Sequence, residues 1–174
     1  MRLLFTGLMC MTLACPVWAE SVVKINIQWK YKDFADQVQL YEAKGQPPLW
    51  QTKSVSNLAA VPVSAKITEA SFQVVPGQRK RFVLVVENPS DQPVYFFAAP
   101  HTVHPEEDTL GFKFKCLCIN HAFTIGPKQI WYRVVELRLS DEYIGKELTI
   151  SHTIIGVDKK RAASFSNETT MPDM

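Results

Sequence analysis

Residues Val23–Lys30 read VKINIQWK, and apolar side chains alternate with polar ones along this whole stretch. A period of two is typical of a β-strand that buries one face and exposes the other. We therefore predict a strand at Val23–Lys30.

The chain continues after Val63 as short runs rich in β-branched and aromatic residues. Turn signals such as Pro76-Gly77 and Gly126-Pro127 separate these runs. The predicted strands are Val63–Ile67, Ser71–Val75, Arg81–Glu87, Val94–Ala99, Phe112–Cys118, Gln129–Leu139 and Leu148–Val157. Most gaps between them are too short for the helices that a parallel α/β fold requires. The pattern predicts an all-β chain folded as an antiparallel β-sandwich.

The segment before Val63 carries weaker signals. Asp33–Lys44 places Phe34, Val38 and Tyr41 at helical spacing, which predicts a short amphipathic helix. Thr52–Pro62 is polar and small, which predicts a loop. The predicted division of the chain is a signal peptide at 1–19, an N-terminal extension at 20–62, the sandwich domain at 63–158 and a flexible tail at 159–174.

Composition excludes several classes of function. The 174 residues are 47% hydrophobic and 21% charged, with a net charge of +2, which is too small for a phosphate-binding basic surface. The sequence contains neither GxGxxG nor GxxxxGK[ST], so nucleotide chemistry has no support, and it lacks GxSxG, HExxH and CxxC. Cys116 and His121 could form a nucleophile pair, but no carboxylate is identifiable to orient the histidine. We therefore predict that the protein is not an enzyme.

The first residues predict export. Arg2 precedes an apolar run that is too short to span a bilayer comfortably, and Val17-Trp18-Ala19 has small residues where a signal peptidase cleaves. We predict cleavage after Ala19, a periplasmic location and no transmembrane segment in the mature chain. The alternative is lipid attachment at Cys15, for which Thr12 is a poor match.

Cleavage would leave Cys116 and Cys118 as the two cysteines of the mature chain. A disulfide between them would close a strained ring and almost no loop, so it would add little stability. On an extended strand both thiols point to one face, and paired soft thiolates suit Cu(I). The alternative is a pair of small buried residues.

Several other side chains are candidates for completing such a site. His121 and His104 are our first choices as third ligands because they lie closest to the pair in sequence, with His101 behind them. We assign no function to His152, which lies in a late strand. Met171 and Met174 offer thioether sulfurs in the tail.

Five short stretches of the chain follow one another in a distinctive order: Phe72–Gly77, Asn88–Val94, Val103–Pro105, Phe112–Ile119 and Ser140–Asp141. This order of motifs resembles the CtaG family of cytochrome c oxidase assembly proteins. That family carries an N-x-S-D-x-P-V turn, a V-x-P element and a C-F-C-F motif in the same order, and the resemblance covers Val63 to Val157.

The resemblance implies an immunoglobulin-like β-sandwich with Cu(I) held by Cys116 and Cys118, often across a homodimer. It also implies copper delivery to the CuB site of cytochrome oxidase subunit I. Leu117 and Ile119 replace the two aromatic residues of the family motif. Family members carry an N-terminal membrane anchor where this chain has a predicted cleavable signal, so the resemblance is to a soluble exported variant.

Together these observations predict a periplasmic Cu(I) metallochaperone that transfers copper by thiolate ligand exchange. Its client would be a cytochrome oxidase or another exported copper enzyme, and copper storage remains an alternative to delivery. Two other classes stay open: a metal-free β-sandwich that binds a partner through an exposed strand edge, and a thiol oxidoreductase that cycles the two cysteines.

Overall fold

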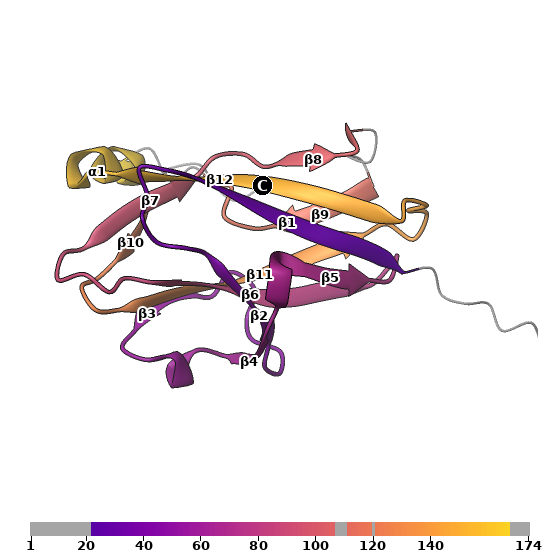
Figure 1. The fold of residues 1–174 in the computed structure, drawn as a ribbon, viewed down its shortest axis with the longest axis horizontal. Helices are drawn as coiled ribbons and strands as arrows, with labels where there is room; N and C mark the ends of the chain where they lie inside the picture. Colours follow the sequence, from indigo (N-terminus) through magenta and orange to yellow (C-terminus); the bar gives the residue numbers. More distant parts are fainter. Residues whose placement is uncertain (1–21, 107–110, 120, 168–174) are drawn as a thin grey trace, which may run out of the picture.

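The computed structural model describes residues 22–106, 111–119 and 121–167, which form almost entirely β structure (Figure 1). The elements are β1 (Val23–Lys32), β2 (Gln39–Ala43), β3 (Thr52–Val55), η1 (Leu58–Ala60), β4 (Val63–Lys66), η2 (Thr68–Ala70), β5 (Ser71–Val74), β6 (Arg79–Glu87), β7 (Val94–Ala98), β8 (Thr102–His104), β9 (Phe112–Lys115), β10 (Phe123–Ile125), β11 (Ile130–Leu139), β12 (Glu147–Val157) and α1 (Lys159–Asn167). The predicted signal peptide at 1–19, with Cys15, lies outside the described residues, as do Met171 and Met174.

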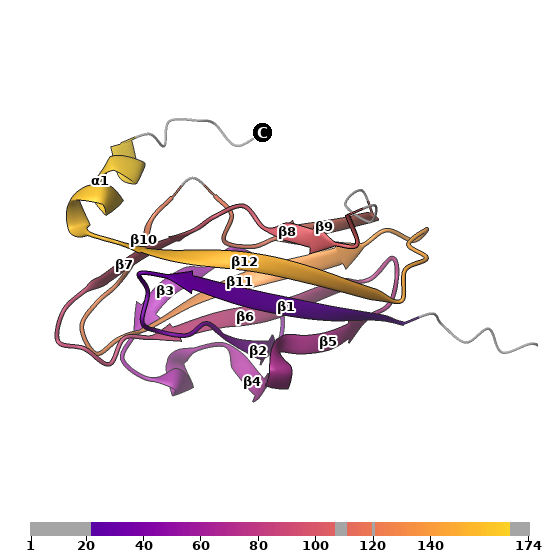
Figure 2. The same ribbon diagram turned by 45° about the horizontal axis from the view of Figure 1, so that its top comes forward.

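The strands form two sheets that enclose a common core (Figure 2). Sheet A has the order β10-β7-β12-β1-β5, with β8 also paired to β12. Sheet B has the order β3-β11-β6-β2-β4, with β9 also paired to β11. Every pairing among the described strands is antiparallel except that of β1 with β12, which run parallel. The structure confirms the predicted all-β class and the sandwich-like arrangement.

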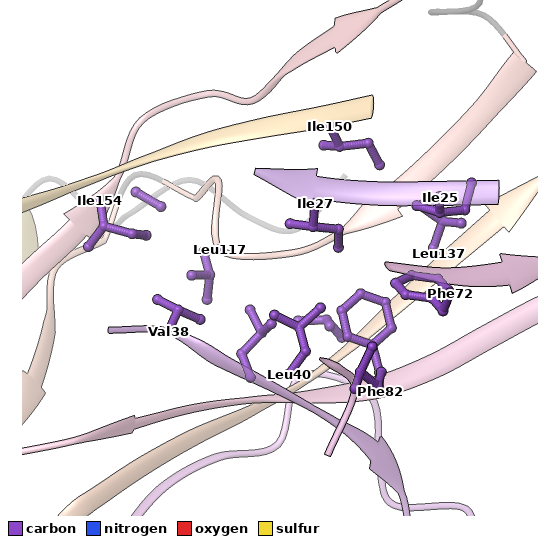
Figure 3. Close-up of a cluster of buried hydrophobic side chains, with 14 of the residues drawn as sticks. Ile25, Ile27, Val38, Leu40, Phe72, Phe82, Leu117, Leu137, Ile150 and Ile154 are labelled. Atoms are coloured by element: carbon purple, nitrogen blue, oxygen red, sulfur yellow. The ribbon is translucent and has the colours of Figure 1, made fainter. Parts of the chain in front are cut away.

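The main core lies between the sheets and contains the inward side chains of both (Figure 3). A smaller cluster, which includes Tyr41, Val83 and Tyr132, lies on the outer face of sheet B, with Leu58 of η1 and Val63 of β4 packed against it. Buried on both faces, the middle of β6 is an unbroken apolar run, Phe82 to Val86, rather than an alternating one.

The N-terminal segment is part of the sandwich. Residues 20–62, predicted as an extension, contribute β1 between β12 and β5, β2 between β6 and β4, and β3 beside β11. The predicted helix at Asp33–Lys44 is wrong, because Asp33 turns the chain at φ 51° and β2 pairs with β6. The predicted loop at Thr52–Pro62 is wrong at its start, where β3 pairs with the edge of β11.

The predicted flexible tail begins with a helix. The Asp158 carboxylate accepts a hydrogen bond from the Arg161 backbone N–H at 2.7 Å, which caps the first turn of α1. Ala162 is buried, and the Phe165 ring packs on Phe97 with centroids 5.0 Å apart. This packing on sheet A orders a segment that has no strong helical signal of its own.

The chain crosses between the two sheets before and after β9. β7 and β8 pair with two separate parts of β12, and the pairing is interrupted between Ala99, whose backbone N–H still donates to the Thr153 carbonyl oxygen at 2.9 Å, and Thr102. After β8 the chain enters sheet B as β9 and then returns to sheet A as β10. β8 and β9 therefore lie near each other at the same end of the molecule (Figures 1 and 2).

Gly156 provides a test of how the turn after β1 packs. A Cβ atom at this position would overlap the Asp33 carbonyl group and lie 3.3 Å from the Phe34 Cα. Because backbone atoms cannot move aside as a flexible side chain can, we expect Gly156→Ala to cost about 1–3 kcal/mol. Urea unfolding measures this cost, and Thr153→Ala on the same strand is the control. An unchanged midpoint for Gly156→Ala would contradict this packing.

A candidate metal site of two cysteines and two histidines

The two cysteines lie in a tight loop directly after β9. β9 ends at Lys115, so the prediction of a strand that continues through Cys118 is wrong. Leu117 points into the core, where it is fully buried as part of the main cluster (Figure 3). The chain bends at Leu117, so that Cys116 and Cys118 lie on either side of it with their sulfurs 3.1 Å apart.

Two histidines complete a compact group of possible ligand atoms. His101 Nδ1 lies 3.2 Å from Cys118 Sγ and 3.6 Å from Cys116 Sγ. His152 Nδ1 lies 3.6 Å from Cys118 Sγ. All four ligand atoms lie within 4.8 Å of one another. We call His101, Cys116, Cys118 and His152 the Cys2His2 cluster.

Each histidine is positioned by sheet A. His101 lies in the interruption between β7 and β8, where the chain turns away from the edge of the sheet. His152 lies on β12 in the same inward-facing series as Ile150 and Ile154, so its ring is placed at the core face. The cluster therefore joins a loop from sheet B to a regular strand of sheet A.

Aromatic rings form the walls of the cluster. The Trp29 indole stacks on the His152 ring with centroids 5.0 Å apart, and Phe114 meets the same ring edge-on at 5.4 Å. His152 Nε2 is buried without a hydrogen-bond partner in the structure, as is Trp29 Nε1. The unpartnered nitrogen is therefore Nε2, whereas Nδ1 is the His152 atom beside Cys118 Sγ.

The two thiols differ sharply in acidity. A hydrogen bond with the Cys118 thiol lowers the pKa of Cys116 to about 4, although burial acts in the opposite direction, and His101 adds a smaller lowering. The same contact with Cys116 raises the pKa of Cys118 above its ordinary value, and burial adds to this. The contact therefore favours loss of one proton from the pair over loss of both, and a bound metal ion would have to displace the second proton.

The cluster has a buried side and an accessible side. Cys116 and His152 are buried, whereas His101 and Cys118 are each partly exposed. Two thiolate sulfurs with two imidazole nitrogens suit borderline and soft ions such as Zn²⁺ and Cu⁺ better than Mg²⁺ or Ca²⁺. His101 and Cys118 are therefore the two members of the cluster that reach the surface.

The structure brings together only part of the predicted ligand set. Cys116 and Cys118 are in the cluster, but His104 and His121 are not. His104 is exposed on β8, where the neighbouring Val103 packs toward the core instead. His121 packs against the Phe123 ring at a centroid distance of 5.4 Å.

Nearness in sequence did not identify the two histidines that lie beside the sulfurs. His101, which we ranked third, and His152, to which we assigned no function, occupy the positions beside the sulfurs. The run from Leu148 to Ile154 did contain the signal, since His152 interrupts an inward-facing apolar series.

The fold and the cluster define a β-sandwich protein with a candidate Cys2His2 metal site. The chain belongs to the family described as Domain of unknown function (DUF8709), whose model matches residues 23–157. A comparison with curated proteins found no match. Among the described residues no helix is both long and apolar enough to cross a membrane.

His152 makes a testable contribution to the pH dependence of folding. Burial lowers its pKa from 6.5 to about 4, with the Cys116 thiolate acting in the opposite direction. As the pH falls, His152 of the unfolded chain is therefore protonated near pH 6.5, whereas His152 of the folded chain is protonated only near pH 4. The contribution of neutral His152 to the free energy of unfolding is therefore fully present above pH 6.5. It is lost as the pH falls from 6.5 to 4, which lowers the free energy of unfolding by up to about 3 kcal/mol.

We expect His152→Gln to reduce the acid-induced loss of stability in the metal-free, reduced protein. Chemical unfolding at several pH values between 4 and 6.5 measures the difference. His104→Gln is the matched control because His104 is exposed. Parallel stability curves for wild type and His152→Gln would contradict the buried neutral state of His152.

Proposed function

We propose that this protein binds one Cu(I) ion at the Cys2His2 cluster and transfers it to another protein. The observation that carries the proposal is the convergence of four ligand atoms within 4.8 Å of one another. Soft thiolates favour Cu(I), and the partly exposed His101 and Cys118 leave room for an incoming ligand. The motif resemblance to the CtaG copper-delivery proteins supports the same assignment.

The client and location follow as parts of this proposal. The signal-like sequence at 1–19 supports an exported, periplasmic chaperone, and the resemblance supports a cytochrome oxidase or another exported copper enzyme as client. Because one chain supplies four ligand atoms, copper does not need to be shared between two chains. We therefore expect a metal-loaded monomer rather than the copper-linked homodimer that the resemblance implies.

A structural Zn(II) site is the second candidate. Its supporting observation is the donor set itself, since Cys2His2 is a usual set for tetrahedral zinc. The half-exposed edge of the cluster favours transfer over permanent retention. Comparison of the two ions on the same protein separates the candidates.

The direct test is an anaerobic Cu(I) titration of reduced Glu20–Met174 against a chromophoric chelator, with a parallel Zn(II) titration. We expect tight binding of one Cu(I) per chain, lost in Cys116→Ser/Cys118→Ser. His101→Ala and His152→Ala should each weaken binding by about 10- to 100-fold. His104→Ala and His121→Ala are matched controls and should bind as wild type does.

Three outcomes would contradict the proposal or its site. Failure of the wild type to compete for Cu(I) would remove the chaperone function. Tight Zn(II) binding without competitive Cu(I) binding would favour the structural zinc site. Loss of copper binding in the His104 or His121 variants, with His152→Ala unaffected, would mean that the ligand set is different.

The unequal burial of the ligands predicts the order of release. The partly exposed ligands His101 and Cys118 should leave first, while Cys116 and His152 hold the ion from the buried side. We expect His101→Ala to transfer copper to a small dithiol acceptor faster than wild type, beyond what its lower affinity explains. Stopped-flow rates at several acceptor concentrations measure this effect, and a rate independent of acceptor concentration would contradict direct ligand exchange.

A further inference from the structure

Arg133 is a buried cation beside the cysteine loop. It lies on β11 in the inward-facing series that also contains Trp131, Val135 and Leu137, and only 6% of its surface is exposed. A charged residue in this series is costly unless something nearby compensates its charge. Its presence therefore needs an explanation that packing alone does not give.

The contacts of Arg133 direct it to the loop that carries the thiols. Its Nε donates a hydrogen bond to the Cys116 carbonyl oxygen at 3.2 Å, and its Nη1 donates to Thr52 Oγ1 at 2.7 Å. The guanidinium also lies over the Phe123 ring, 5.5 Å from its centroid. The guanidinium thus holds the backbone of a residue that carries one of the two sulfurs.

A thiolate supplies the opposite charge. Among the described residues no carboxylate forms an ion pair with Arg133. Desolvation lowers the pKa of Arg133, and the nearby Cys116 thiolate raises it. The group that favours a charged guanidinium in this pocket is therefore one of the ligands of the cluster.

We propose that Arg133 is a specificity-determining residue whose fixed positive charge makes the Cys2His2 cluster prefer a monovalent over a divalent metal ion. This inference rests on the proposed function. Two thiolates and Arg133 together carry a net charge of −1, which one Cu⁺ neutralises. A Zn²⁺ ion at the same position would leave a buried net charge of +1.

The effect on selectivity follows from Coulomb's law. Arg133 stabilises the two thiolates to the same extent whichever ion they bind, so this benefit cancels when two ions are compared. Its repulsion of the metal ion does not cancel, because the repulsion is twice as large for a divalent ion. Removing the charge should therefore raise the ratio of Zn(II) to Cu(I) affinity, even if both affinities fall.

The first test uses Arg133→Gln and Arg133→Lys in the full mature chain, titrated with Cu(I) and Zn(II) separately. We expect the ratio of Zn(II) to Cu(I) affinity to rise about tenfold or more in Arg133→Gln. Arg133→Lys keeps the charge and should leave the ratio near that of the wild type. Circular dichroism and thermal unfolding check that each variant is folded.

A second pair of variants tests the charge without removing the arginine. Thr52 is half-buried and already accepts a hydrogen bond from Arg133, so Thr52→Asp places a carboxylate against the guanidinium. We expect this variant to raise the affinity ratio as Arg133→Gln does. Thr52→Asn, similar in size but uncharged, is the control and should not change the ratio.

The outcomes separate this inference from the proposed function. A raised ratio in Arg133→Gln or Thr52→Asp, but not in Arg133→Lys or Thr52→Asn, supports charge selection. If both affinities fall by equal factors in Arg133→Gln and Thr52→Asp leaves the ratio unchanged, Arg133 only positions the loop and the inference is overturned. If the wild type binds neither ion, the proposed function fails, and the inference fails with it.

Discussion

The burial of Leu117 is the interaction on which the candidate site depends. Its side chain is fully enclosed in the core between the two sheets, while the residues on both sides of it carry the sulfurs. Burying a leucine contributes about 2–3 kcal/mol, enough to hold a short loop in one arrangement. The loop, in turn, places both sulfurs against the histidine rings of sheet A. The same side chain therefore belongs to the core and fixes the position of the loop that carries the sulfurs.

The sequence indicated the architecture well because sandwich strands have a simple period. Val23–Lys30 and the runs after Val63 each contain a strand, although β9 ends at Lys115. Alternation marks β1 and β12, and an unbroken apolar run marks β6, which is buried on both faces. The failures at β2, β3 and α1 share a cause. Each of these short segments is stabilised by a distant partner, β6, β11 or β7, and a local pattern carries no information about that partner.

The site was predictable only in its sulfur ligands. Two thiols separated by one residue stay close in almost any backbone conformation, so the sequence alone predicts that the two sulfurs lie near each other. Histidine ligands come from other elements, and their distance along the chain does not report their distance in space. His152 lies far from the cysteines in sequence and next to them in the fold, and Arg133 reaches the same loop from β11 of the opposite sheet.

The parallel pairing of β1 with β12 has a consequence for when the site can exist. These strands come from opposite ends of the domain, and their pairing sets Trp29 of β1 opposite His152 of β12. A chain that is made, or threaded through a membrane, from its N-terminus has β1 available long before its partner strand arrives. Contacts between such distant segments carry a high entropic cost and form slowly. His152 and the Trp29 indole come together only when β12, the last strand, joins the sheet. A partly made or partly folded chain therefore has the two thiols without the complete cluster.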